Sequence, residues 1–150
     1  VGSEMCIRDS PYLQKVCIVG AAEKLIKALH PNYGEKLKFY SETELSHEEG
    51  WNRFSHEHLN EPVYISVDKD VLDIKSAVTN WDQGSLSLTE LEKLLSIILK
   101  KEEIIGVDIC GECSSSLDVF QKNRELSINS KANKELLNLF LSNQNEIHPL

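Results

Sequence analysis

The stretch EPVYISVDKDVLD, residues 61–73, decides the fold of this chain. Pro62 cannot continue a helix, and the apolar run 63–67 that comes after it is rich in β-branched and aromatic side chains. The run lacks a clean alternation of apolar and polar residues, which predicts a strand that is buried on both faces. Such strands are typical of parallel sheets in α/β proteins.

Three acids end this strand, namely Asp68, Asp70 and Asp73. Residues two apart in an extended segment point the same way, so the carboxylates of Asp68 and Asp70 are expected to share a face. Two carboxylates held that close repel each other unless a cation or a shared proton lies between them. A divalent metal bound by oxygen ligands is therefore the economical explanation.

The composition narrows the class of protein. The chain has 150 residues, the length of one domain, and its 41% hydrophobic and 27% charged residues are those of a soluble globular protein. The net charge of −8 argues against a nucleic-acid partner, because such proteins need basic patches. No apolar run has the length that spans a membrane or the form of a signal peptide. The four cysteines form no dense disulfide framework, which favours a cytoplasmic location.

The first ten residues, VGSEMCIRDS, fit poorly with the rest of the sequence, and the first of them is Val1 rather than Met. They resemble a translated sequencing adapter, so we expect residues 1–10 to be a non-native leader. Residues 11–150 are then expected to be the C-terminal portion of one longer domain.

Strand and helix patterns alternate along the chain. Strands are predicted at 15–20, 36–40, 63–67 and 103–109, and helices at 21–30, 46–56, 88–101 and 130–142. Two capping-box patterns, Ser46–Glu49 and Ser87–Glu90, predict helix starts, and 110–126 is predicted to be a loop. This β-α-β-α order predicts a parallel sheet with helices on both faces.

Ligands of open parallel sheets gather at the carboxyl ends of the strands. Asp68 and Asp70 follow one strand, and Glu112 follows the next. A right-handed crossover places both strand ends on the same side, so the three acids are expected to converge. The alternative is that these acids only cap the turns after the strands.

These segments resemble the arginase, agmatinase and formimidoylglutamase family of metal-dependent ureohydrolases. The resemblance lies in YISVDKDVLD (64–73), GSLSLTELEKLL (84–95) and IIGVDICGE (104–112), and it covers about half of the chain. It implies an arginase-like α/β fold, a three-layer α/β/α sandwich with a parallel sheet, whose N-terminal part is missing from this sequence.

The resemblance also implies a binuclear Mn²⁺ site. In the family motif S-x-D-x-D-x-x-D the first two acids bind metal, so Asp68 would bridge two ions, Asp70 would bind one of them, and both would act in catalysis. Asp73 falls on the third, supporting acid, and Glu112 falls where the family places a glutamate that pairs with the substrate's cationic group. A metal-bridging hydroxide would attack a guanidinium-type carbon. The remaining ligands are expected in the missing N-terminal part, in G-G-D-H and D-x-H-x-D segments.

The chain departs from the family pattern beside these acids. A proline and a P-G-T-G-T-P-like loop are replaced by IKSAVTNWDQG (74–84), and Lys69 stands where an apolar residue is usual. That loop shapes the substrate pocket, so the identity of the substrate stays open. Within it, Trp81 and Asp82 are candidates for substrate contacts, and the alternative for Trp81 is a packing anchor.

The sequence therefore predicts a metal-dependent hydrolase of C–N bonds in linear amidine or guanidino compounds, present here as a fragment that is inactive by itself. The expected partner is a small guanidino or amidine substrate, not nucleic acid or a membrane, and a homo-oligomer stays open. One alternative is an arginase-fold binding protein that has lost catalysis. Another is a haloacid-dehalogenase-type phosphatase, although the last position of its D-x-D-x-T frame is Leu72 here.

Two further patterns point less clearly to a site. Cys110 and Cys113 have C-x-x-C spacing, but three serines and a polar loop come next, so two packed thiols are expected rather than a redox or zinc motif. The segment His56-Glu57-His58 is expected to be a solvated helix end rather than a metal site.

Overall fold

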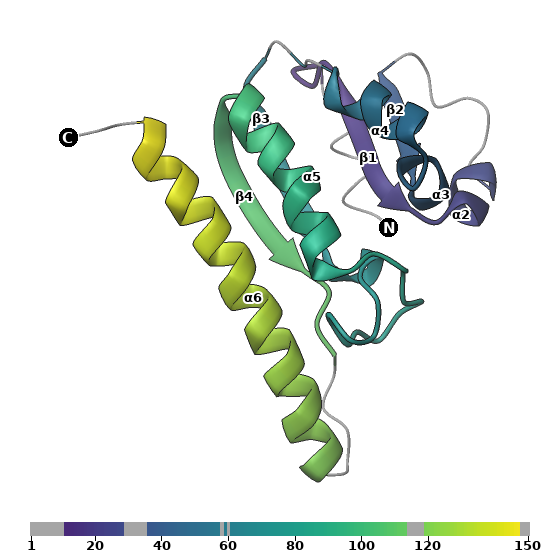
Figure 1. Ribbon diagram of the computed structural model, residues 1–150, viewed down its shortest axis with the longest axis vertical. Helices are drawn as coiled ribbons and strands as arrows, with labels where there is room; N and C mark the ends of the chain where they lie inside the picture. The colour runs from purple at the N-terminus through teal and green to yellow at the C-terminus, as the bar shows by residue number, and fades with distance from the viewer. Residues whose placement is uncertain (1–10, 29–35, 58, 60, 114–118, 148–150) are drawn as a thin grey trace. The chain divides into compact units, whose positions relative to one another are not determined.

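The computed structural model describes residues 11–28, 36–57, 59, 61–113 and 119–147. The chain forms two compact units, Val1–Glu57 and His58–Leu150, and each contains one pair of parallel strands with helices (Figure 1). The α/β class and the parallel strand pairing predicted from the sequence are confirmed. The expected leader, residues 1–10, lies outside the described residues.

In the first unit, β1 (Val16–Ala21) pairs in parallel with β2 (Leu37–Ser41). The helix α2 (Glu23–Ala28) lies between these strands in the sequence, and α3 (Glu42–Leu45) and α4 (Glu48–Ser55) come after them. The buried rings of Tyr40 and Phe54 meet edge to face, with 5.3 Å between their centroids. This aromatic pair attaches α4 to the strand pair.

The helix predicted at 46–56 is present as α4, but the capping box predicted at Ser46 is wrong. A separate short helix, α3, comes first, and its N-cap is Ser41, whose hydroxyl accepts a hydrogen bond from the N–H of Glu44. Ser46 ends that helix and donates its hydroxyl to the carbonyl of Thr43, so its side chain is not available to cap the next helix. The N-cap of α4 is His47, without a side-chain cap.

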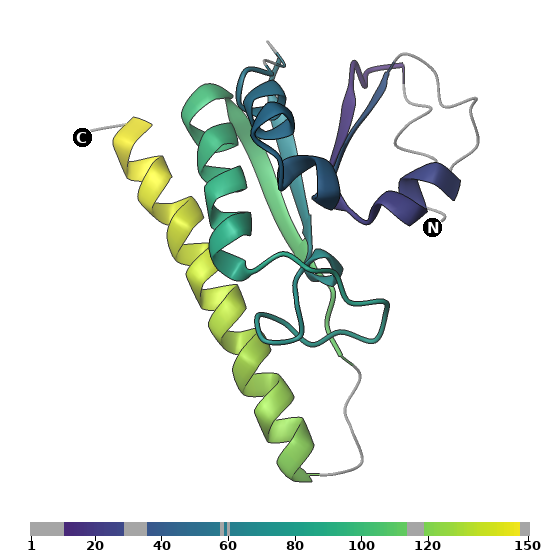
Figure 2. The same cartoon turned by 45° about the vertical axis from the view of Figure 1, so that its right-hand side comes forward.

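In the second unit, β3 (Val63–Asp68) pairs in parallel with β4 (Ile104–Cys110). The helix α5 (Leu88–Lys101) connects the two strands, and the Ser87–Glu90 capping box predicted at its start is confirmed. The helix α6 (Val119–Ile147) comes after β4, and both helices lie on the same side of the strand pair (Figure 2). The core is apolar and comes from β3 and both helices: Ile65, Val67, Leu91, Leu94, Leu95, Leu99, Ala132, Leu136 and Phe140.

Contrary to the sequence-based expectation, β3 is buried on one face only. Ile65 and Val67 are buried, whereas Tyr64, Ser66 and Asp68 on the opposite face are exposed. The reason is that α5 and α6 share one side of the strand pair (Figure 2). The alternation leaves a polar strand face that leads directly to Asp68.

The helix α6 begins earlier than the sequence predicts. Part of the expected loop 110–126 is helical from Val119, where Gln121 donates a side-chain hydrogen bond to Glu125 one turn later. The residues of this turn, QKNREL, include strong helix formers, which explains the longer helix. Within the described ranges, no helix is both long enough and apolar enough to span a membrane.

Candidate functional site

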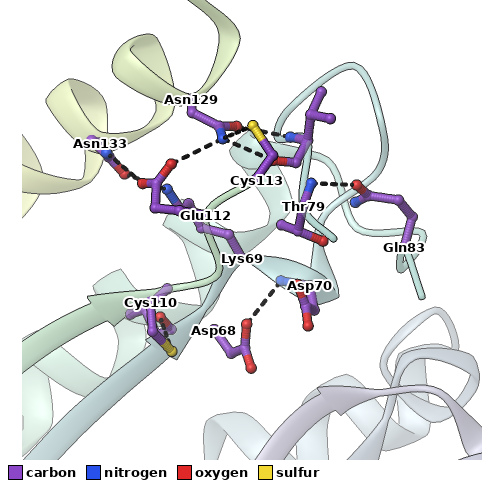
Figure 3. A network of polar contacts seen from close by, with 12 residues as sticks. Asp68, Lys69, Asp70, Thr79, Gln83, Cys110, Glu112, Cys113, Asn129 and Asn133 are labelled. Carbon is purple, nitrogen blue, oxygen red and sulfur yellow. Dashed lines mark hydrogen bonds and ion pairs between the residues drawn. The ribbon is translucent and has the colours of Figure 1, made fainter. Parts of the chain in front are cut away.

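The candidate site begins where β3 ends. Asp68 caps the short 3-10 helix η1 (Lys69–Val71), because its Oδ1 accepts a hydrogen bond of 3.0 Å from the N–H of Asp70. Figure 3 shows the carboxylates of Asp68 and Asp70 on the same side of this turn, with the side chain of Lys69 on the other side. Lys69 lies between the two aspartates in the sequence, but the turn directs its side chain away from theirs.

The two carboxylates have no cationic partner in the part of the chain that the structure describes. No Lys or Arg there forms an ion pair with Asp68 or Asp70. The Oδ1 atom of Asp70 is buried and accepts no hydrogen bond from any described group. A buried carboxylate oxygen without a partner is costly, so this corner of the unit is suited to a bound cation.

The loop after β4 approaches these acids at Gly111. This glycine has a φ of +83°, and a Cβ atom there would lie 2.8 Å from Oδ1 of Asp68 and 2.9 Å from the backbone nitrogen of Lys69. A left-handed backbone and a contact this close both require glycine. Gly111 therefore decides how near the loop comes to the strand end.

The side chain of Lys69 is completely buried, with 0% exposure, and it forms an ion pair with Glu112. Its Nζ also donates a hydrogen bond of 2.8 Å to Oδ1 of Asn133. Two amides complete the cluster: Asn133 donates to Oε1 of Glu112 at 3.1 Å, and Asn129 donates to Oε2 at 3.0 Å (Figure 3). We call Lys69, Glu112, Asn129 and Asn133 the Lys69 network.

The Lys69 network determines the pKa and the position of the Glu112 carboxylate. Partial burial raises the pKa of Glu112, but hydrogen bonds from Lys69 and Asn133 outweigh it and hold that pKa below its usual range. Of the three acids expected to converge, the structure brings Asp68 and Asp70 together and holds Glu112 apart from them (Figure 3). The physical reason is that Lys69 points to the opposite side of the turn and captures the Glu112 carboxylate.

The loop that links η1 to α5 is attached to the site by its backbone. Gly84 donates its N–H to the carbonyl of Asp70 at 2.7 Å, and a Cβ atom on Gly84 would lie 2.2 Å from the carbonyl oxygen of Val71. At the start of the loop, Oδ1 of Asp73 accepts a hydrogen bond of 2.8 Å from the N–H of Ser76. Asp73 is therefore a turn cap in the structure.

Two side-chain amides hold the middle of the same loop. Asn129, 2% exposed on α6, accepts from the N–H of Val78 and donates to its carbonyl, both at 2.8 Å. Gln83 accepts from the N–H of Thr79 at 3.0 Å and donates to the carbonyl of Leu72 at 2.8 Å. These contacts order the loop without the proline and glycine pattern of the ureohydrolase family.

The candidate substrate residues of this loop lie on its surface. Trp81 is 75% exposed, and Asp82 is exposed as well. The packing role weighed for Trp81 is thus wrong for the described chain, because its indole ring is largely in solvent. Both side chains are placed where a ligand could reach them.

The two cysteines of the C-x-x-C pattern lie on opposite sides of the strand end (Figure 3). The thiol of Cys110 contacts the carbonyl of Val67 at 3.5 Å, and the sulfur of Cys113 accepts from Asn129 at 3.8 Å. Within the described ranges, no three His, Cys, Asp or Glu residues could together hold a metal ion. The described chain therefore offers a pair of carboxylates, Asp68 and Asp70, rather than a complete metal site.

A charge cluster in the first unit was missed by sequence reasoning. Glu57, expected in a solvated helix end, accepts hydrogen bonds from Lys15 at 2.9 Å, Lys38 at 2.6 Å and the hydroxyl of Tyr40 at 2.8 Å. Burial raises the pKa of Glu57, but the bonds from Lys38 and Lys15 lower it to about 2. The partners are far from Glu57 in sequence, so no local spacing pattern reveals them. His58 lies outside the described residues.

The chain is similar to an uncharacterized protein of Thermotoga maritima, with 39% identity over 103 residues, or 67% of the chain. The chain spans about a third of that relative's length, since the match covers 35% of it. No family model matches the chain. No solved structure matches it either.

Proposed function

We propose that the whole protein is a metal-dependent hydrolase of C–N bonds in linear amidine or guanidino compounds, and that this chain supplies two carboxylates of its binuclear Mn²⁺ site. The observation that carries the proposal is the buried Oδ1 of Asp70, which accepts no hydrogen bond from any described group although Asp68 lies beside it. In this proposal, the two strand pairs are parts of one three-layer α/β/α sandwich of the arginase type.

The donor chemistry fits a hard divalent cation. Carboxylate oxygens are ligands that Mn²⁺ accepts, and two aspartates without a cationic partner among the described residues supply the charge that a dication needs. When bound, the metal ions would polarise water and substrate. The other ligands would come from protein beyond these 150 residues, for which the longer Thermotoga maritima relative leaves room.

The chain's own residues would have three tasks. Asp68 and Asp70 would hold the metal, and Gly111 would keep the loop after β4 close to Asp68. Trp81 and Asp82 would contact the substrate, because an indole face and a carboxylate both attract a guanidinium group. The fixed attachment of the loop would present these two side chains in a defined position.

A second candidate is an arginase-fold binding protein without catalysis. The observation that favours it is the ion pair of Glu112 with Lys69, since the resemblance assigns Glu112 to the substrate's cation. Turnover separates the two candidates: the hydrolase releases urea or an equivalent product from a guanidino compound, whereas the binding protein retains the compound unchanged.

The test begins with manganese binding to the 150-residue chain, measured by electron paramagnetic resonance. We expect weak binding that falls about tenfold or more in Asp68→Asn and Asp70→Asn, because one ligand charge is lost in each. The matched control is Asp108→Asn, an exposed aspartate of β4 whose carboxylate accepts from Ser66, and it should bind like the unaltered chain.

The decisive step uses the full-length protein. Asp68→Asn there should abolish hydrolysis of guanidino compounds such as agmatine or arginine while leaving circular dichroism unchanged. A variant that keeps its manganese and its full turnover would exclude the proposed role of Asp68.

A further inference from the structure

Lys69 is a residue of the site that the proposed function does not use. It lies between Asp68 and Asp70, and its side chain is 0% exposed. A lysine is almost never completely buried without a partner, because removing an ammonium group from water is expensive. An apolar residue would fill the same space without that cost, so the ammonium group itself has a task.

The ammonium group of Lys69 lies between two acceptors of the Lys69 network. It contacts the carboxylate of Glu112 and, at 2.8 Å, the amide oxygen of Asn133. Asn133 and Asn129 also donate to the two oxygens of Glu112 and so orient the carboxylate. A carboxylate and an amide oxygen turned toward one cationic nitrogen are the chemistry that recognises an alkylammonium or guanidinium group.

A second cation would bind only weakly to Glu112. The side chain of Glu112 keeps 55% exposure, but Lys69 already balances its charge. Another cation at the same carboxylate would lie a few ångströms from the ammonium group, where like charges repel. The carboxylates of Asp68 and Asp70 differ in this respect, because no described Lys or Arg pairs with them.

We infer that Lys69 permanently fills a cation site formed by the side-chain oxygens of Glu112 and Asn133, so that Glu112 is a positioning residue and the cationic end of a substrate binds elsewhere. The statement about the substrate's cationic end rests on the proposed function. The statement that Lys69 fills the cation site does not. Glu112 then joins the loop after β4 and the helix α6 to the turn that carries Asp68 and Asp70.

Chemical rescue tests this inference. Lys69→Ala removes three methylene groups and the ammonium group, which are the atoms of n-propylammonium. We expect the melting temperature of Lys69→Ala to rise saturably with propylammonium chloride at constant ionic strength, and that of the unaltered chain to show no saturable rise. Neutral 1-propanol should not substitute, because the acceptors require a cation.

The matched control is the double variant Lys69→Ala/Glu112→Gln. Its affinity for propylammonium should be about tenfold lower or weaker still, since a neutral amide replaces the charged acceptor. Equal responses of the single and double variants would overturn the inference. The titration is done without metal, so its outcome is independent of manganese binding to Asp68 and Asp70.

A second measurement needs no folded Lys69 variant. The side-chain carboxyl carbon of Glu112 is followed by ¹³C nuclear magnetic resonance in the unaltered chain while agmatine is added, and Glu112→Gln identifies the signal. We expect no saturable shift of this signal. A saturable shift would show that Glu112 accepts the cationic ligand and would overturn the inference.

Discussion

The side-chain amide of Asn129 pairs with both backbone groups of Val78, accepting from its N–H and donating to its carbonyl, each at 2.8 Å. The two residues are 51 positions apart, and the amide of Asn129 satisfies the N–H and the carbonyl of Val78 as the backbone of a neighbouring β-strand would. Because Asn129 also donates to Glu112, the loop 74–86 and the Lys69 network share one anchor.

Asn129→Ala should therefore destabilise the second unit by about 2–3 kcal/mol, since it removes several hydrogen bonds and leaves the partly buried backbone groups of Val78 without their side-chain partner. Urea unfolding measures the loss, and hydrogen exchange at the amide of Val78 should become faster. The control is Asn138→Ala, an exposed asparagine of the same helix, which has the same change in helix propensity. Equal unfolding free energies of the two variants would contradict the anchor role.

Gly111→Ala should both destabilise the chain and disturb Asp68. The positive φ alone costs an alanine about 1–2 kcal/mol, and the added Cβ atom would meet Oδ1 of Asp68 at 2.8 Å. We expect lower stability in urea and weaker manganese binding. Gly20→Ala, at a φ of 82° in the first unit, carries a similar backbone penalty and should leave manganese binding unchanged. Unchanged binding in both variants would mean that Gly111 does not position Asp68.

Removing the carboxylates of two neighbouring aspartates should change the stability of the chain in opposite directions. Asp70→Ala removes a buried oxygen that has no described partner, so it should stabilise the metal-free chain by about 1 kcal/mol. Asp73→Ala removes the acceptor of the Ser76 N–H and should destabilise it by a similar amount. Urea unfolding without metal compares the two. If Asp70→Ala is the less stable variant, the carboxylate has a partner that stabilises the fold.

The strands and the α/β class could be predicted because each strand is a short segment rich in apolar and aromatic residues. Each predicted strand agrees with the structure to within one residue at either end. The Ser87 capping box could also be predicted, since all its contacts lie within four residues. Local patterns of this kind are encoded in consecutive residues and need no knowledge of the tertiary structure.

The Lys69 network could not be predicted for the opposite reason. Its ion pair joins residues 43 positions apart, and the contact with Asn133 spans 64 positions. Alternation along the strand implies that Lys69 points away from Asp68 and Asp70, but it does not show which acid lies on that side. Sequence reasoning identified Lys69 only as a departure from a family pattern, and it therefore did not predict the ion pair of Lys69 with Glu112.

The first unit should lose stability in acid through Glu57. Its carboxylate has a pKa of about 2, against an ordinary value of 4.5, because the hydrogen bonds from Lys38 and Lys15 overcome the effect of burial. Between pH 4.5 and pH 2, Glu57 therefore stays ionised in the folded state but binds a proton in the unfolded state. The stabilisation is complete above pH 4.5 and is lost as the pH falls from 4.5 toward 2, and the whole loss is on the order of 2–3 kcal/mol.

Trp51 reports on this unit, because its ring lies 6.3 Å from that of Phe54 in α4. In a Trp81→Phe background it is the single tryptophan of the chain, so its fluorescence follows unfolding of the first unit by urea at each pH. Glu57→Gln should be less stable than the unaltered unit at pH 6, and its stability should change less between pH 5 and pH 2.5. Glu49→Gln, at an exposed glutamate of α4, should keep the full acid dependence. The two variants should differ because Glu57 is held by two lysines and a tyrosine hydroxyl. If Glu57→Gln and Glu49→Gln show the same acid dependence, groups other than Glu57 cause the loss of stability in acid.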